Sequence, residues 1–416
     1  MSNTTIGTER ISRQGWLIVL VCLFGISTGP AAMGIASMGL FARALGESFQ
    51  WDRSQLSLAV SVMMLCTAAS MPVAGYLVDR FGVRRVLLPS VVLLALCMVM
   101  LGMMQNYWQF MAAYVAMGTL AVGTNSVPYM RLLASWFDRQ RGLAIGIAGS
   151  GTGLGFAYVP LITENTISAY GWRGGYFSLA ILLMLVTFPL IALLLKDPPT
   201  AVVREGEGPP ANSVGASLAQ ALRQRDFWLL AIIFVSLAGL LYGLIPHLVP
   251  MMTDRGISDS QAAWIASLFG FSAFGGRLLI GMLIDHFDAR KIAFIFFLLS
   301  AVGLGIFMIP TNPMWMIVLA AILLGGSLGA EVDMLAYFTS RYFGLRHFAK
   351  IFGVLFGAVL VAMGIGPLIF GMVFDSTGSY QAILMLGVPV CLVSIVFLLG
   401  LRPYGERARG GPVSVT

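Results

Sequence analysis

Charged side chains occur inside two long apolar runs of the sequence. Glu331 and Asp333 lie within PMWMIVLAAILLGGSLGAEVDMLAYFTSRYFG, and Arg277 lies within SLFGFSAFGGRLLIGMLID. A charge at membrane depth costs several kcal/mol unless a counter-ion, a proton or water neutralises it. Arginine cannot release its proton and therefore needs an anion, whereas a carboxylic acid shielded from water can hold a proton. These residues predict an organic-anion site combined with a proton carrier.

We assign Arg277 to substrate binding and the two acids to proton coupling. Residues two apart on a helix point about 200° away from each other. We therefore expect Glu331 to face a central cavity and Asp333 to pack against a neighbouring helix or the cytoplasmic loop. Two alternatives remain open for Arg277: a permanent structural pair with one of the acids, or a side chain that reaches the cytoplasmic surface.

A second group of polar residues could also contact a ligand in the membrane. His247 stands between Pro246 and Pro250, which we expect to break the helix and free carbonyl groups. The alternative is a histidine that only bonds a freed carbonyl. Three further candidates for substrate contact are Asn125, Tyr129 and Tyr337.

Composition requires that these residues sit in a membrane protein. Hydrophobic residues make up 58% of the 416-residue chain and charged residues 10%, where a soluble protein carries about 25% charged residues. Apolar runs of about 20 residues recur from end to end, and we count about twelve spans. The prediction is an all-α integral membrane fold with twelve transmembrane helices in two pseudo-symmetric six-helix bundles.

The longest polar segment divides the spans into six and six. It covers residues 196–226 and is rich in Pro and Gly. We predict an N-terminal bundle at 1–195, a cytoplasmic linker with a short surface helix near 215–223, and a C-terminal bundle at 227–416.

Most Lys and Arg residues fall in loops on one side of the predicted spans. The other side has only Arg43, Arg53, Arg173 and Arg255. Basic residues favour the cytoplasmic side, so both termini and the linker are expected there, with the chain in the cell (inner) membrane. The net charge of +7 is thus topological and predicts no nucleic-acid partner.

The two halves of the sequence repeat each other. A shift of about 206 residues places GYLVDRFGVRR (75–85) on GMLIDHFDARK (281–291). Six spans per half give both copies the same orientation, and parallel repeats around a central cavity are typical of transporters.

The segment GYLVDRFGVRRVLL resembles the loop between the second and third helices of the major facilitator superfamily. The resemblance implies that this loop and its copy gate alternating access without touching substrate. The gating residues carried over are Gly75, Asp79, Arg80, Gly82, Arg84, Arg85, Asp285 and Arg290. We expect Asp79 to cap or pair across the contact between the halves. The copy departs from the pattern at His286 and Asp288.

A narrower resemblance is carried by WFDRQRGLAIGIAGSGTGLG (136–155), which is similar to the bacterial branch of the monocarboxylate transporter family. In that family an arginine of the eighth helix anchors the substrate, and Arg277 matches it by helix and context. Mammalian members have an aspartate four residues earlier, where this chain has Ala273. The tenth-helix acids are the expected replacement.

The predicted function is secondary transport of a small monocarboxylate with a proton by alternating access. An anion exchanger or efflux carrier is the alternative, and a non-transporting sensor a weaker one. No catalytic constellation, metal cluster or nucleotide-binding loop stands out, so we expect no enzyme activity, metal or cofactor. The expected partners are a small carboxylate, protons and lipid, with a monomer as the functional unit.

Overall fold

The computed structural model describes residues 13–137, 140–195, 215–309, 313–344 and 346–402. Within these residues, ten helical stretches are long and apolar enough to cross a membrane. One of them, 142–194, contains two spans, because Gly171 interrupts it with φ 71° and ψ 177°. A broken helix pair at 107–136 adds another span, so the described part of the chain crosses twelve times, as predicted.

The first half contains several interrupted spans. Gly29-Pro30 separates α1 from a π-helical turn, because proline has no N–H to continue the ladder. The fourth span breaks between α5 and α6, and the fifth breaks at Gly149–Ser150. The helices of this half are α1 (Arg13–Ser27), η1 (Ala31–Ala36), α2 (Met38–Phe49), α3 (Arg53–Phe81), α4 (Val83–Met103), α5 (Tyr107–Thr119), η2 (Val122–Thr124), α6 (Ser126–Trp136), α7 (Arg141–Gly149), α8 (Gly151–Leu182), η3 (Leu183–Thr187) and α9 (Phe188–Leu194).

The second half is built of longer, continuous helices. It begins with the short helix α10, whose predicted position is confirmed. The remaining helices are α11 (Arg225–Thr253), α12 (Asp259–His286), α13 (Ala289–Met308), α14 (Met314–Phe343), α15 (Phe348–Thr377) and α16 (Gln381–Leu399), and α10 itself spans Leu218–Leu222. The expected break at Pro246 and Pro250 is wrong, because α11 runs through both prolines to Thr253.

The start of this half is attached to the C-terminal bundle. Gly215 forms an isolated β-bridge with Gly344, and the amide of Ala216 donates to the carbonyl of Phe343. Ser217 then caps α10. The exact domain limits stay a prediction, since 196–214 lies outside the described residues.

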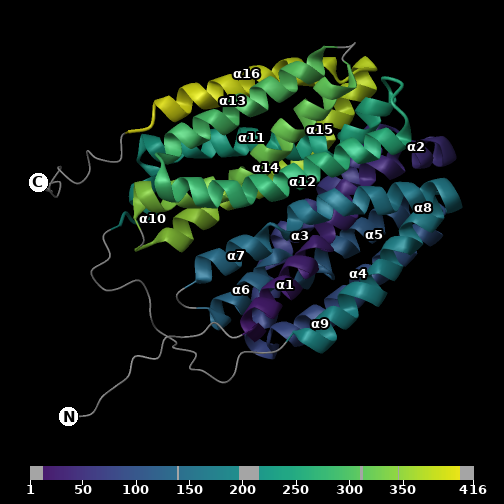
Figure 1. Cartoon of the computed structure of the whole chain (residues 1–416), viewed down its shortest axis with the longest axis horizontal. Coiled ribbons are helices and arrows are strands. Elements are labelled where there is room, and N and C mark those ends of the chain that lie inside the picture. Colours follow the sequence, from purple (N-terminus) through teal and green to yellow (C-terminus); the bar gives the residue numbers. More distant parts are fainter. Residues whose placement is uncertain (1–12, 138–139, 196–214, 310–312, 345, 403–416) are drawn as a thin grey trace, which may run out of the picture.

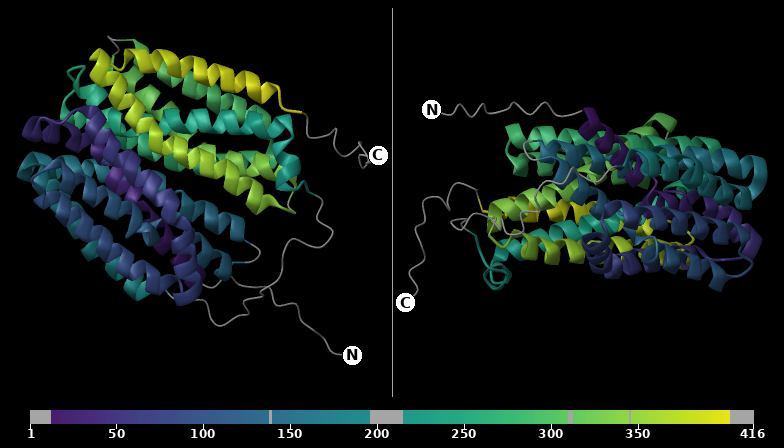
Figure 2. Two further views of the ribbon diagram at one scale, coloured as in Figure 1. Left: turned by 180° about the vertical axis from the view of Figure 1, so that it is seen from behind. Right: turned by 90° about the horizontal axis from the view of Figure 1, so that it is seen from below.

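The helices form two bundles, α1–α9 and α11–α16 (Figure 1). We call one side of the molecule the basic end, where helices end at Phe81, Trp136, His286 and Phe343; the opposite side is the far end. The two bundles meet through α2 on α11, α3 on α15 and α8 on α12. Figures 1 and 2 show the bundles close together at the far end and spread apart toward α7 and α10.

Candidate functional site

Arg277 lies where the two bundles touch, on α12 facing α8 and α14. Its Nη1 donates to the carbonyl oxygen of Gly149 at 2.9 Å, and its Nη2 pairs with Asp333 Oδ1 at 3.0 Å. A Cβ atom at Gly149 would lie 2.9 Å from the Arg277 guanidinium carbon, so the close approach depends on glycine. The guanidinium therefore joins the N-terminal bundle to the C-terminal bundle at the break between α7 and α8.

The two acids of α14 are placed the other way round from the prediction relative to Arg277. Asp333, expected to pack away from the site, is half-exposed and binds Arg277. Glu331 is 3% exposed, and neither of its carboxylate oxygens has a hydrogen-bond partner among the described residues. The helical offset that separates them is as expected; the sequence could not tell which side faces Arg277.

A small, partly open space adjoins Arg277 between the bundles. Its volume is about 50 Å³, enough for one or two water molecules. Both bundles contribute to its wall, which is about equally polar and apolar and contains one charged group, Arg277. The lining residues are Thr152, Gly153, Phe156, Tyr242, Ala273, Arg277, Leu328, Gly329 and Val332.

Tyr242 is a site residue that sequence reasoning missed. It lies on α11, lines the central space, and is close enough to interact electrostatically with both Arg277 and Glu331. A signal was present: Tyr242 precedes Pro246 by four residues, and a proline leaves the carbonyl at that position without its helical donor.

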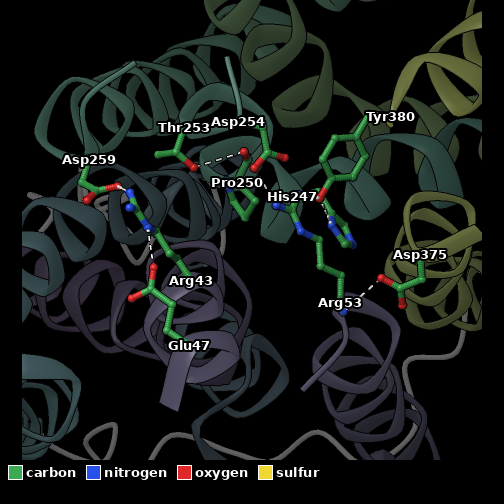
Figure 3. Close-up of polar contacts among 10 residues, drawn as sticks. All are labelled: Arg43, Glu47, Arg53, His247, Pro250, Thr253, Asp254, Asp259, Asp375 and Tyr380. Atoms are coloured by element: carbon green, nitrogen blue, oxygen red, sulfur yellow. Dashed lines mark hydrogen bonds and ion pairs between the residues drawn. The ribbon is translucent and has the colours of Figure 1, made fainter. Parts of the chain in front are cut away.

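His247 does not line the central space. It lies beside Tyr380 and Arg53, near the far end (Figure 3). Its Nδ1 is 2.8 Å from the Tyr380 hydroxyl, and its Nε2 is 3.0 Å from both the Pro367 carbonyl and Ser57 Oγ. The histidine is buried, and its carbonyl partner belongs to α15 and not to its own helix. Because Ser57 is on α3, the histidine also bridges the two bundles.

The structure does not bring the other three predicted contacts to Arg277. Tyr129 is fully buried in the N-terminal bundle, where a Cβ atom at Gly25 would meet its hydroxyl. Asn125 is the residue directly before α6, and its side-chain amide donates to the carbonyl of Val122 at 3.3 Å. Tyr337 accepts from Arg341 at 3.1 Å toward the basic end. None of these residues lines the central space in this conformation.

The first of the two predicted gating loops is held by contacts inside its own bundle. Asp79 forms an ion pair with Arg131 of α6, so the expected pairing across the bundles is not present in this conformation. Arg84 donates to the carbonyl of Ala192 at 2.5 Å, and Arg80 to the Tyr76 hydroxyl at 3.0 Å. Gly82 adopts φ 86°, a backbone conformation that favours glycine. Gly75 has open space around it, and Arg85 is exposed.

The second loop, 281–291, differs from the first copy at Asp288, and the structure gives a local reason for this difference. Asp288, which stands where the first copy has glycine, accepts from the amide of Arg290 at 2.9 Å and so caps α13. The Arg290 guanidinium also pairs with Asp288 at 3.5 Å and reaches the carbonyl of Leu401. The side chain of Asp285, one of the predicted gating residues, lies outside the described part of the structure.

Comparisons with known proteins agree with this architecture. The chain is 25% identical over 404 residues to human monocarboxylate transporter 11, covering 93% of this chain and 83% of that protein. It is 26% identical over 404 residues to the 4-hydroxybenzoate transporter PcaK of Pseudomonas putida, covering 86% and 89%.

A solved structure shares the fold. The inward-facing, unoccupied bacterial homologue of the human lysosomal transporter Spinster matches with a TM-score of 0.64 at 19% identity, covering 94% of this chain and 96% of that one. The family model for the Major Facilitator Superfamily matches residues 22–250 and 237–415, nearly the whole chain. The resemblance read from the loops is therefore confirmed: this chain belongs to the Major Facilitator Superfamily of membrane transporters, and it is not an enzyme.

Proposed function

We propose that this transporter moves a small monocarboxylate together with a proton. The observation that carries the proposal is the Arg277 guanidinium between the bundles, bonded to one carboxylate and one backbone carbonyl. The names of two relatives, a monocarboxylate transporter and a 4-hydroxybenzoate transporter, support an anion with one carboxylate. Under this proposal the protein works in the inner membrane with its basic end in the cytoplasm.

Arg277 binds the substrate carboxylate by exchanging partners. Asp333 and the Gly149 carbonyl now occupy its two outer nitrogens, and its Nε is buried without a partner among the described residues. A guanidinium binds a carboxylate through two parallel hydrogen bonds, so a substrate carboxylate can take the place of Asp333. Asp333 then holds Arg277 between transport cycles, when no substrate is present.

Glu331 carries the proton. An ionised carboxylate with no partner in an apolar interior costs far more than the neutral acid, so the observed burial favours the protonated form. Tyr242 lies near both Glu331 and Arg277, which links the proton site to the anion site. Loss of the proton would require Glu331 to reach water or a cation, and movement of the bundles supplies that access.

The proposal is tested in proteoliposomes with radiolabelled lactate, pyruvate and benzoate under an imposed pH gradient. We expect an acidic outside to accelerate uptake of at least one acid. Arg277→Lys should lower uptake on the order of tenfold or more, because lysine cannot form the paired bonds. Arg173→Lys is the matched control, since Arg173 stacks on Trp172 within its own bundle.

Glu331→Gln tests the proton step separately. The variant should keep carboxylate exchange but lose acceleration by the pH gradient. Uptake that needs carboxylate inside the vesicle and ignores the gradient would instead identify an exchanger. The proposal fails if none of the acids enters, or if Arg277→Lys transports as well as the native protein.

A further inference from the structure

The far end of the molecule is closed by a carboxylate of one bundle on a helix start of the other. Asp375, at the end of α15, accepts from the backbone amides of Arg53 at 3.2 Å and Ser54 at 2.7 Å (Figure 3). These are the first two residues of α3. Their N–H groups have no helical partner, and the helix dipole favours a negative charge there. A Cβ atom at Gly371 would lie 2.8 Å from the Ser54 Cα, so glycine permits the approach.

We call this contact between the start of α3 and the ends of α11, α15 and α16 the seam. The Arg53 side chain makes a second set of contacts across it. Its Nη2 pairs with Asp254 at 2.7 Å, and its Nη1 donates to the Tyr380 hydroxyl at 2.6 Å. The guanidinium also lies 3.7 Å from the centre of the Phe374 ring. One arginine of the N-terminal bundle thus contacts three residues of the C-terminal bundle, through an ion pair, a hydrogen bond and a cation–π contact.

The hydrogen bonds continue from this seam to His247 in a fixed direction. The Pro367 carbonyl can only accept, so the histidine Nε2 carries the hydrogen. The Tyr380 oxygen accepts from Arg53, and its own hydrogen is left to donate to the histidine Nδ1 at 2.8 Å. The order of donation is therefore Arg53 to Tyr380 to His247 to the Pro367 carbonyl.

We propose that Arg53 and Tyr380 are positioning residues that tie closure of the far end to the ring orientation and tautomer of His247. Arg53 and Ser57 belong to the N-terminal bundle, and Tyr380, His247 and Pro367 to the other. Separation of the bundles at the far end removes Arg53 from Tyr380 and Ser57 from His247 in the same movement. His247 therefore has different hydrogen-bond partners when the far end is closed and when it is open. The inference does not rest on the proposed transport of a monocarboxylate with a proton.

The first experiment reads the histidine ring directly. The chain has three histidines, so full-length protein labelled with nitrogen-15 histidine gives few ring signals, and His286→Gln and His347→Gln identify the signals of His247. In the native protein we expect a neutral ring with hydrogen on Nε2. Arg53→Gln should shift the His247 signals although Arg53 does not touch the ring. Arg173→Gln should leave them unchanged.

The second experiment measures the seam. Spin labels at Ser48→Cys and Ser260→Cys, two exposed serines at the far ends of α2 and α12, report the distance between the bundles. Cys66 is replaced by serine because it is the partly exposed cysteine, while Cys22, Cys97 and Cys391 are buried. Asp375→Asn and Arg53→Gln should each lower the population at short distance by about threefold or more. Arg173→Gln should not lower it.

The outcomes separate this inference from the transport proposal, because neither measurement uses a substrate. A hydrogen on the Nδ1 of His247 in the native protein contradicts the order of donation from Arg53 through Tyr380 to His247. So does an Arg53→Gln variant that opens the seam and leaves the His247 signals in place. An unchanged seam in both Asp375→Asn and Arg53→Gln overturns the closure. If Arg53→Gln does not fold, Arg53→Lys, which keeps the charge but not the fork, and Tyr380→Phe provide the same readings.

Discussion

The two ends of the molecule use their charged residues in different ways. At the far end, where basic residues are few, Arg43 and Arg53 both bond across to the C-terminal bundle, at Asp259 and Asp254. At the basic end, the ion pair between Asp79 and Arg131 stays within one bundle. The number of charges therefore says little about what holds the bundles together. The far end is closed by a few well-placed groups, while the Asp79–Arg131 and Arg290–Asp288 ion pairs at the basic end each stay within one bundle.

Glycines show the same difference. Near the far end and at the middle of the seam, a Cβ atom at Gly371 or Gly270 would collide with backbone of the opposite bundle. At the basic end, Gly75, Gly142 and Gly146 have nothing within 4 Å of such an atom. Small residues permit close helix contact. We infer that the basic-end glycines serve the other conformation, in which that end closes.

The largest expected effect belongs to Gly270→Ala. A Cβ there would lie 2.3 Å from the backbone of Phe156 and Ala157, which cannot move without shifting α8. Overpacking at such a contact costs about 3 kcal/mol, so we expect a loss of about 3–4 °C in Tm, measured by thermal unfolding in detergent. Gly275→Ala, on an open face of the same helix, is the control. Equal melting of the two variants would show that the α8–α12 contact is not tight.

Gly75→Leu probes the conformation in which the basic end closes. Because the space around Gly75 is open here, the Tm should stay within about 2 °C of the native value. Radiolabelled uptake should nevertheless fall several-fold, since a leucine would obstruct closure. The Gly275→Leu variant serves for comparison. Unimpaired uptake by Gly75→Leu would contradict the role given to the basic-end glycines.

Asp79→Asn should have a smaller effect on stability. Both members of its ion pair with Arg131 are about half-exposed, and such pairs contribute up to about 1 kcal/mol. We expect a Tm change of at most about 3 °C and no change in the far-end spin-label distance. A widened far-end distance in this variant would show that the two ends are not independent.

Arg43→Gln should have the smallest effect. Its contact with Asp259 is 3.5 Å long, and both side chains are more than half-exposed. The seam distance and the Tm should match those of the native protein within error, in contrast to Arg53→Gln. A seam as open as that of Arg53→Gln would mean that any charge at this end contributes to closure, and not the specific contacts of Arg53.

The architecture was predictable because its signals are local and repeated. Long apolar runs, basic loops and the copied 75–85 segment each follow from a few neighbouring residues, and the buried position of Arg277 follows from its span alone. The pairing of Arg277 with Asp333 was open in the sequence, because either acid of α14 lies at a suitable depth. The rotation of α14 about its axis decides which acid faces Arg277. The sequence does not fix that rotation, because apolar residues occur on all sides of this helix.

The far-end seam could not be predicted. Arg53, Asp254, Asp375 and Tyr380 each stand near the end of a different helix, where a charged or polar residue is ordinary. They meet only because four helix ends converge after the bundles assemble, with Arg53 and Asp375 separated by 322 residues. The continuity of α11 through its two prolines was missed for a related reason, since packing against α2 and α15 overrides the local preference.

The strand-like bridge between Gly215 and Gly344 has a consequence for engineering the chain. It fastens the residues before α10 to the end of α14, so the C-terminal half has its own anchored beginning. The N-terminal half likewise finishes with an ordered Leu195, whose amide bonds the carbonyl of Ile191. A chain cut anywhere between these two anchors leaves each half with its helices and their ends intact. Two co-expressed fragments should therefore reassemble in the bilayer into a working carrier.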